Sequence, residues 1–265
     1  MAEQEIRYAV LLRKPEQLAF PALAEILARR RGCPTLDAMA SARSCWGILE
    51  QDREEAAAKD LAAALTAAGL EALALPQNLL EELPAAQAAA KADLDQRVFF
   101  SDSGEALPAA APVLLCAAII KRTVTQTIKV QKDIGLAQKA LQVGLIMASG
   151  LPIRTASMRK EEGKVVASTE LRGLLDLVFV EPDRRLRVVS DDFDYSCLKD
   201  KKTFDSLSNF RLLARRLAGF WPEAGRSRGL RFILENQPQR EMGYESPVDL
   251  ERESRWLLTL KALRV

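Results

Sequence analysis

Hydrophobic and polar positions follow two periods in the first 75 residues. The apolar run Arg7–Leu12 is typical of a buried strand, and apolar side chains then recur at helical spacing over Phe20–Arg30. The other elements that the pattern predicts are a second short helix from Pro34, a strand over Cys45–Leu49, a helix opened by a capping box of Asp52 and Glu55, and a strand over Leu70–Leu75. We therefore predict a small βααβαβ domain over residues 1–75.

A different pattern begins after this domain. Residues 76–92 are rich in alanine and glutamine, contain Pro84 and carry few large apolar side chains, so we expect a linker there. A second, β-rich domain is expected over residues 93–265. Its predicted strands are Arg97–Phe100 in a hairpin that returns by Pro108, Val113–Val130, Val165–Val180, Arg185–Val189 and Leu230–Leu234.

Helices complete the predicted second domain. Apolar positions recur at helical spacing over Phe204–Phe220, and Ser246 followed by Pro247 is a typical helix start. Trp256 lies on an apolar stripe of the final helix, so we expect it to be buried. Residues 135–150 are apolar on most sides, and both core packing and docking on a partner fit them. We predict that the chain is an α+β protein.

Two known folds share these element orders. The segments RYAVLL, the helix pair, GILEQDREEAAAKDLAAAL and AGLEALAL give an order that resembles the C-terminal domain of the ribosomal stalk protein and the related ClpS-type adaptors. The several strands followed by a helix in the second domain look like a pleckstrin-homology type of β-barrel. Such folds carry many different functions, so the resemblance implies a fold and no ligand.

The chain differs from the ClpS-type adaptors at the residues that bind the peptide ligand in that family. ClpS-type adaptors bind peptide N-termini with an Asn-Asp pair after the first strand and with a histidine. In this chain the equivalent stretch is Arg13-Lys14-Pro15-Glu16, and histidine is absent. We therefore expect the adaptor fold without the recognition of peptide N-termini.

Composition excludes several kinds of site. Without histidine, no Ser-His-Asp or Cys-His site is possible within the chain. The cysteines are far apart, form no CxxC pair and are expected to be buried free thiols: Cys33, Cys45, Cys116 and Cys197. We expect no bound metal and no cofactor. No apolar run approaches the ~20 residues of a membrane-spanning helix, and the start of the chain lacks a signal-peptide pattern, so we expect a cytoplasmic protein.

Charge points to two alternative sites in the second domain. Residues 1–92 carry a net charge of −3 and residues 93–265 a net charge of +5. The candidate binding residues are six basic side chains that would attract an anionic membrane surface or a phosphate-bearing ligand: Arg184, Arg185, Arg187, Lys199, Lys201 and Lys202. A solvated face is the alternative for them, and specific nucleic-acid binding is not expected because aromatic residues are few.

Carboxylates form the second candidate site. Asp191, Asp192 and Asp194 are the densest acidic cluster, and carboxylates around Asp192 and Asp194 would serve an enzyme or a hard cation. The spacing lacks the glycine and distal glutamate of a calcium loop, so a solvated turn is the alternative. No catalytic residue is assigned. The interpretation favoured by the sequence is a non-catalytic binding or adaptor protein with a protein partner.

Overall fold

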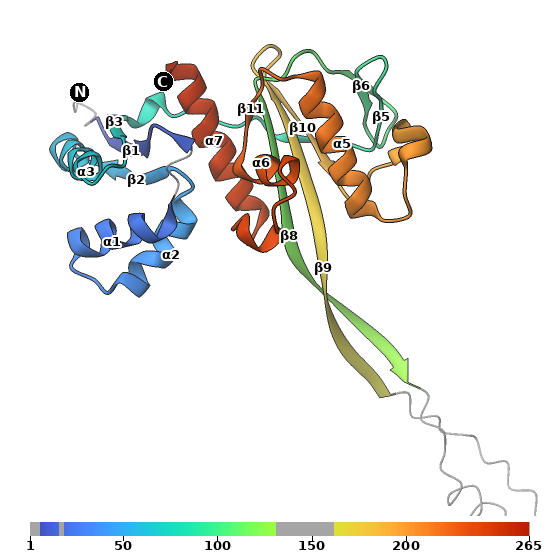
Figure 1. The fold of residues 1–265 in the computed structure, drawn as a ribbon, viewed down its shortest axis with the longest axis horizontal. Helices are drawn as coiled ribbons and strands as arrows, with labels where there is room; N and C mark the ends of the chain where they lie inside the picture. Colours follow the sequence, from blue (N-terminus) through green and yellow to red (C-terminus); the bar gives the residue numbers. More distant parts are fainter. Residues whose placement is uncertain (1–5, 16–18, 131–161, 265) are drawn as a thin grey trace, which may run out of the picture. The chain divides into compact units, whose positions relative to one another are not determined.

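The computed structural model describes residues 6–15, 19–130 and 162–264. The chain divides into two compact units, one of residues 1–121 with 171–265 and one of residues 122–170. Helices and sheets occur together in the first unit, which confirms the predicted α+β class (Figure 1). Among the described residues, every helix is too short or too polar to span a membrane.

The N-terminal part of the first unit has the predicted βααβαβ order. Its elements are β1 (Tyr8–Leu12), α1 (Phe20–Arg31), α2 (Thr35–Cys45), β2 (Ile48–Arg53), α3 (Glu55–Ala67) and β3 (Ala72–Pro76). The sheet order is β2-β1-β3, and both neighbours pair antiparallel to β1. Buried apolar side chains of β1, α1 and α3, such as Leu11, Leu23 and Leu65, fill its core.

Two local predictions in this part were wrong. The strand predicted over Cys45–Leu49 begins only at Ile48, because Cys45 ends α2 and the chain then turns through left-handed backbone at Trp46 (φ 44°) and Gly47 (φ 91°). A Cβ atom at Gly47 would lie 1.9 Å from the Trp256 ring, so the turn also needs a residue without a side chain. Asp52 and Glu55 form no capping box, since Asp52 belongs to β2 and Glu54 is the N-cap of α3.

The predicted linker contains paired strands. Within residues 76–92 lie a 3-10 turn, η2 (Gln77–Leu79), and the strands β4 (Ala86–Ala89) and β5 (Lys91–Asp93). Strand β5 pairs with β6 (Val98–Phe100), which pairs with β7 (Ala106–Pro108) in the predicted hairpin. The polarity of these side chains did not predict the two strands, because strands pair through hydrogen bonds between their backbones. The domain boundaries at residues 75 and 93 stay a prediction.

A five-stranded sheet forms the centre of the C-terminal part. Its order is β11-β8-β9-β10-β4, with β8 (Leu114–Val130), β9 (Glu162–Phe179), β10 (Arg184–Val189) and β11 (Gly225–Arg226). The described strands form an open sheet, and no barrel closure is present among them. The likeness to a pleckstrin-homology barrel therefore stays a prediction.

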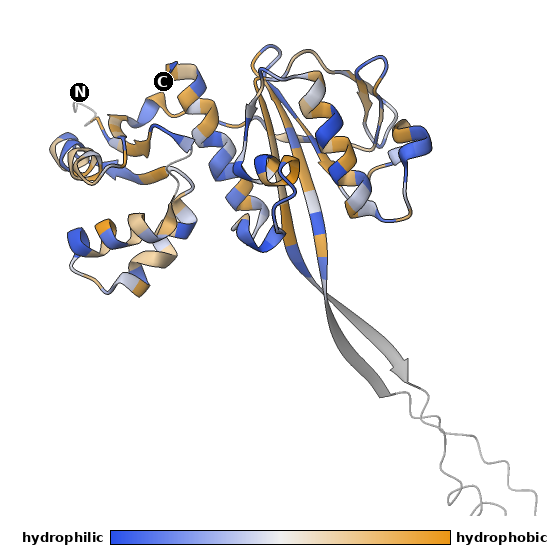
Figure 2. Ribbon diagram, viewed as in Figure 1, coloured by the Kyte–Doolittle hydropathy of each residue, from blue (hydrophilic) through white to orange (hydrophobic). Residues whose placement is uncertain are grey.

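Three helices pack with this sheet: α5 (Ser206–Phe220), α6 (Arg228–Leu234) and α7 (Pro247–Leu263). Figure 2 shows hydrophobic and hydrophilic positions side by side on α5, whose residues Phe210, Leu213 and Leu217 are buried. The predicted strand Leu230–Leu234 was wrong, because Ser227 caps the N–H of Leu230 and starts α6.

Helix α7 joins the N-terminal and C-terminal parts of the first unit. Trp256 is fully buried, as predicted, and its Nε1 donates to the carbonyl oxygen of Leu12 at 2.8 Å. Trp46 and Tyr244 stack with ring centroids 4.3 Å apart and an interplanar angle of 3°. We call Leu12, Trp46, Tyr244, Glu253 and Trp256 the α7 seam.

The second unit comprises the last part of β8 and the first part of β9 in its described residues. Residues 135–150, for which the sequence allows both core packing and docking on a partner, lie outside the described residues.

Candidate functional site

The arginines of β10 take part in a buried ion-pair network. Arg187 binds Asp176 through two bonds of 2.7 Å, from Nε to Oδ1 and from Nη2 to Oδ2. Arg185 Nη1 lies 3.5 Å from Asp176 Oδ2, and Glu251 Oε1 lies 3.4 Å from Arg185 Nη2 and 3.1 Å from Arg187 Nη2. Asp176 is fully buried. Two cations and two carboxylates balance here, so Arg185 and Arg187 neutralise internal charges and present no free basic face.

Arg184 has different neighbours. Its guanidinium carbon lies 5.2 Å from the centroid of the Phe179 ring, and its Nη2 donates to the carbonyl oxygen of Pro108. The structure therefore does not bring Arg184 together with Arg185 and Arg187 in one patch.

The three candidate lysines lie at one 3-10 segment, η3 (Tyr195–Lys201), and directly after it. Lys199 Nζ lies 2.7 Å from Asp95 Oδ2, and this bond raises the pKa of Lys199 and lowers the pKa of Asp95. Lys202 Nζ lies 3.6 Å from Asp194 Oδ1. Lys201 is exposed, and the structure describes no ion pair for it.

The acidic cluster does not converge. Arg172 Nη2 lies 2.6 Å from Asp192 Oδ2, and Arg172 Nε lies 3.8 Å from Asp191 Oδ2. Asp194 caps η3 by accepting from the backbone N–H of Ser196 at 2.9 Å, and this bond lowers its pKa. No group of three metal-ligating side chains occurs within residues 6–15, 19–130 and 162–264. These carboxylates form turns and ion pairs, which is the alternative interpretation that the sequence left open.

Phe204 is the feature that sequence reasoning missed. The pattern placed it at the start of a helix, but α5 begins at Ser206 with Asp205 as its N-cap. Phe204 is fully exposed to solvent. We call Lys201–Asp205 the Phe204 loop. A signal was present in the sequence, because Asp205 is a residue type that favours the helix N-cap and would start the helix after Phe204.

Buried hydrogen bonds hold the backbone of the Phe204 loop. Asn209 is almost fully buried, and its Oδ1 accepts from the N–H of Thr203 at 2.7 Å while its Nδ2 donates to the Thr203 carbonyl oxygen at 2.8 Å. On the other side, Asp205 Oδ2 accepts from the N–H of Ser208 at 2.7 Å, and hydrogen bonding from the side chain and the backbone of Ser208 lowers the pKa of Asp205. The exposed ring is therefore presented by a fixed backbone on both sides.

The other groups with unusual surroundings have structural roles. Glu253 is fully buried; its Oε1 accepts from the N–H of Arg228 at 2.7 Å and its Oε2 from the hydroxyl of Tyr244. Burial raises the pKa of Glu253. The four cysteines are free, and burial raises the pKa of both Cys45 and Cys197 to about 11, so these thiols stay protonated at neutral pH.

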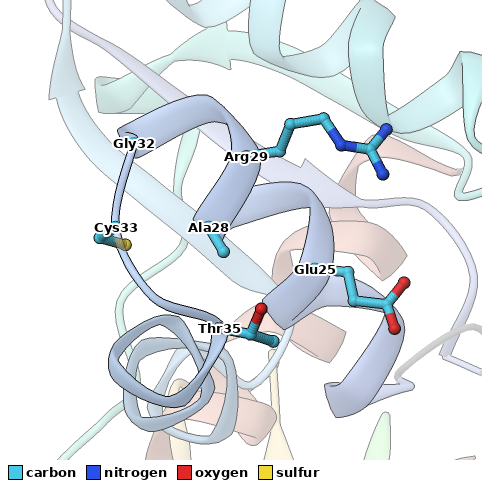
Figure 3. Close-up of a pocket in the computed structure, with 6 residues that line it drawn as sticks. All are labelled: Glu25, Ala28, Arg29, Gly32, Cys33 and Thr35. Carbon is cyan, nitrogen blue, oxygen red and sulfur yellow. The ribbon is translucent and has the colours of Figure 1, made fainter.

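Two surface hollows lie in the N-terminal part. One, of about 470 Å³, lies between the end of α1 and the start of α2 and includes Glu25, Arg29 and Cys33 (Figure 3). The other, of about 560 Å³, lies between α3 and β3 and is lined mainly by alanines. Neither brings together groups with complementary catalytic roles.

No family model, curated protein or solved structure matches the chain.

Proposed function

We propose that this chain is a non-catalytic binding protein that docks a partner protein through the Phe204 loop. The observation that carries the proposal is the full exposure of Phe204 on a backbone held by buried Asn209 and by the α5 cap. An aromatic side chain with a fixed backbone binds at a low entropic cost, and aromatic anchors dominate the energetics of protein interfaces. The βααβαβ order supports the adaptor interpretation as an analogy of fold.

The Phe204 loop carries few cations for binding to an anionic membrane. Burying a Phe side chain contributes ~1.5–3 kcal/mol. On an anionic membrane each lysine near the surface would add about 1 kcal/mol. The Phe204 loop offers Lys201 and Lys202 for this purpose, and Lys202 already lies near Asp194.

The charge around the loop also opposes an anionic surface. Residues 191–205 contain five aspartates and three lysines. These carboxylates would be repelled by acidic lipid headgroups, whereas a protein partner can place cations opposite them. The basic residues therefore support a mixed-charge rim around an apolar anchor, which is the usual composition of a protein interface.

Site-specific photo-crosslinking tests the proposal. Phe204 is replaced by p-benzoyl-phenylalanine, which keeps the aromatic ring, and the full chain is irradiated in its own cells. We expect one discrete protein adduct.

The matched control carries the same photoreactive residue at Leu36, an exposed apolar position on α2. The control should not give the adduct. Adducts that are identical at both positions, lipid adducts at position 204, or no adduct at position 204 would each contradict the proposal.

A further inference from the structure

The surface hollow of about 560 Å³ between α3 and β3 is apolar over most of its lining. We call its apolar lining the alanine hollow: Ala62, Ala63, Ala67, Ala72, Leu73 and Ala74. Thr66 joins the two walls, because its hydroxyl donates to the carbonyl oxygen of Ala62 at 2.9 Å and accepts from the N–H of Ala72 at 3.4 Å. The alanine hollow is therefore already formed in the single chain, and its volume is within the range of roughly 300–1,000 Å³ that holds small organic groups.

Phe204 has the complementary shape and chemistry. Its ring is fully exposed, so it does not occupy the alanine hollow of its own chain. Its backbone is held by Asn209 and by the α5 cap, so the ring can enter a hollow with little loss of entropy. When one chain carries both an exposed apolar side chain and a hollow that fits it elsewhere on its surface, two copies can form a heterologous contact.

We propose that the Phe204 ring of one copy of this chain docks in the alanine hollow of a second copy. The inference rests on the proposed function, because it identifies the partner of the Phe204 loop as the same chain. Docking removes the ring and the alanine methyl groups from water together. The small side chains of the hollow also let the backbone of the loop approach α3 and β3 closely.

Charges beside the ring and beside the hollow support a second copy as the partner. Asp205 directly follows Phe204, and Lys59 lies at the rim of the alanine hollow, so docking brings a carboxylate toward an ammonium group. Lys59 pairs with Glu55 in its own helix, but both side chains are exposed, and such a pair is weak enough to rearrange. The contact also places residues 1–92, with a net charge of −3, against residues 93–265, with a net charge of +5.

Photo-crosslinking between two purified full-length chains tests the pairing. In the donor chain Phe204 is replaced by p-benzoyl-phenylalanine, and the acceptor chain carries an affinity tag and no photoreactive residue. We expect a tagged adduct of about twice the chain mass of 29.3 kDa. Mass spectrometry should map the crosslink to residues 59–74 of the acceptor.

Two acceptor variants at exposed alanines of α3 form a matched pair. Ala63→Glu places a charged side chain in the alanine hollow and a like charge near Asp205, so the yield of the adduct should fall about tenfold or more. Ala56→Glu makes the same change on the same helix outside the hollow and should leave the yield unchanged. Circular dichroism of both variants should match that of the unchanged chain, because both positions are exposed.

Three results would overturn the inference: no adduct between purified chains, a crosslink that maps outside residues 59–74, and equal yields with Ala63→Glu and Ala56→Glu. The proposed function fails in a different way. If the chain captures another protein in cells but gives no adduct with itself, only this inference is contradicted. If position 204 gives no adduct in cells or with the purified chain, both are contradicted.

Discussion

The α7 seam and the Phe204 loop place aromatic side chains in opposite surroundings. Trp256 is enclosed by its own chain and donates a hydrogen bond to Leu12, whereas the ring of Phe204 is in solvent. Trp256 lies within α7, whose N-cap is Ser246, and Phe204 lies just before α5, whose N-cap is Asp205. The comparison shows that helical context does not decide the role of an aromatic residue; what decides it is whether another part of the chain covers the ring.

The largest effect is expected from Trp256→Ala. Truncating a large buried aromatic side chain typically costs ~3–5 kcal/mol, and here the bond to Leu12 is lost as well. The midpoint of urea unfolding should fall sharply. Trp256→Phe keeps most of the volume and should cost less. A midpoint that barely moves in Trp256→Ala would show that the seam contributes little to stability.

Asp176→Asn should have the next largest effect. It leaves Arg185 and Arg187 without their buried carboxylate, and breaking a buried ion pair from one side costs about 3 kcal/mol. Glu251→Gln is the matched control, because Glu251 is partly exposed and should cost less. Equal losses in the free energy of unfolding for the two variants would contradict a buried network centred on Asp176.

Glu253 should make the stability of the seam depend on pH. Burial raises its pKa in the folded chain above the ordinary value of 4.5, so the folded state holds the proton more tightly than the unfolded state. The stabilisation is therefore fully present below pH 4.5 and is lost as the pH rises through the folded pKa.

The variant Glu253→Gln removes this titration. Its free energy of unfolding should fall less than that of the wild type as the pH is raised from 4.5, by about 1.4 kcal/mol for each unit by which folding raises the pKa. Parallel pH profiles of the two chains would refute the raised pKa.

The smallest effect on stability is expected from Phe204→Ala. An exposed side chain without contacts changes the free energy of unfolding by less than about 0.5 kcal/mol. The same change should abolish partner binding through the loop. A loss of stability comparable to that of Trp256→Ala would mean that the ring is buried, and the contrast between the two regions would disappear.

The sequence by itself determined the α+β class, the βααβαβ order of the N-terminal part and the burial of Trp256. These features depend on local signals, namely the period of apolar positions, the residues that end helices and the cap at Ser246. It also led to wrong boundaries at Cys45–Leu49 and Leu230–Leu234, where apolar runs are too short to distinguish a strand from a helix end.

Only the tertiary structure decided what the charged residues do. The sequence showed three arginines near each other on one strand, but the carboxylates that neutralise Arg185 and Arg187 come from β9 and from α7, about ten and more than sixty positions away. Likewise, the exposure of Phe204 depends on Asn209 and on the start of α5. Contacts between residues far apart in the sequence create these surroundings, and the local periodicity of apolar positions does not predict such contacts.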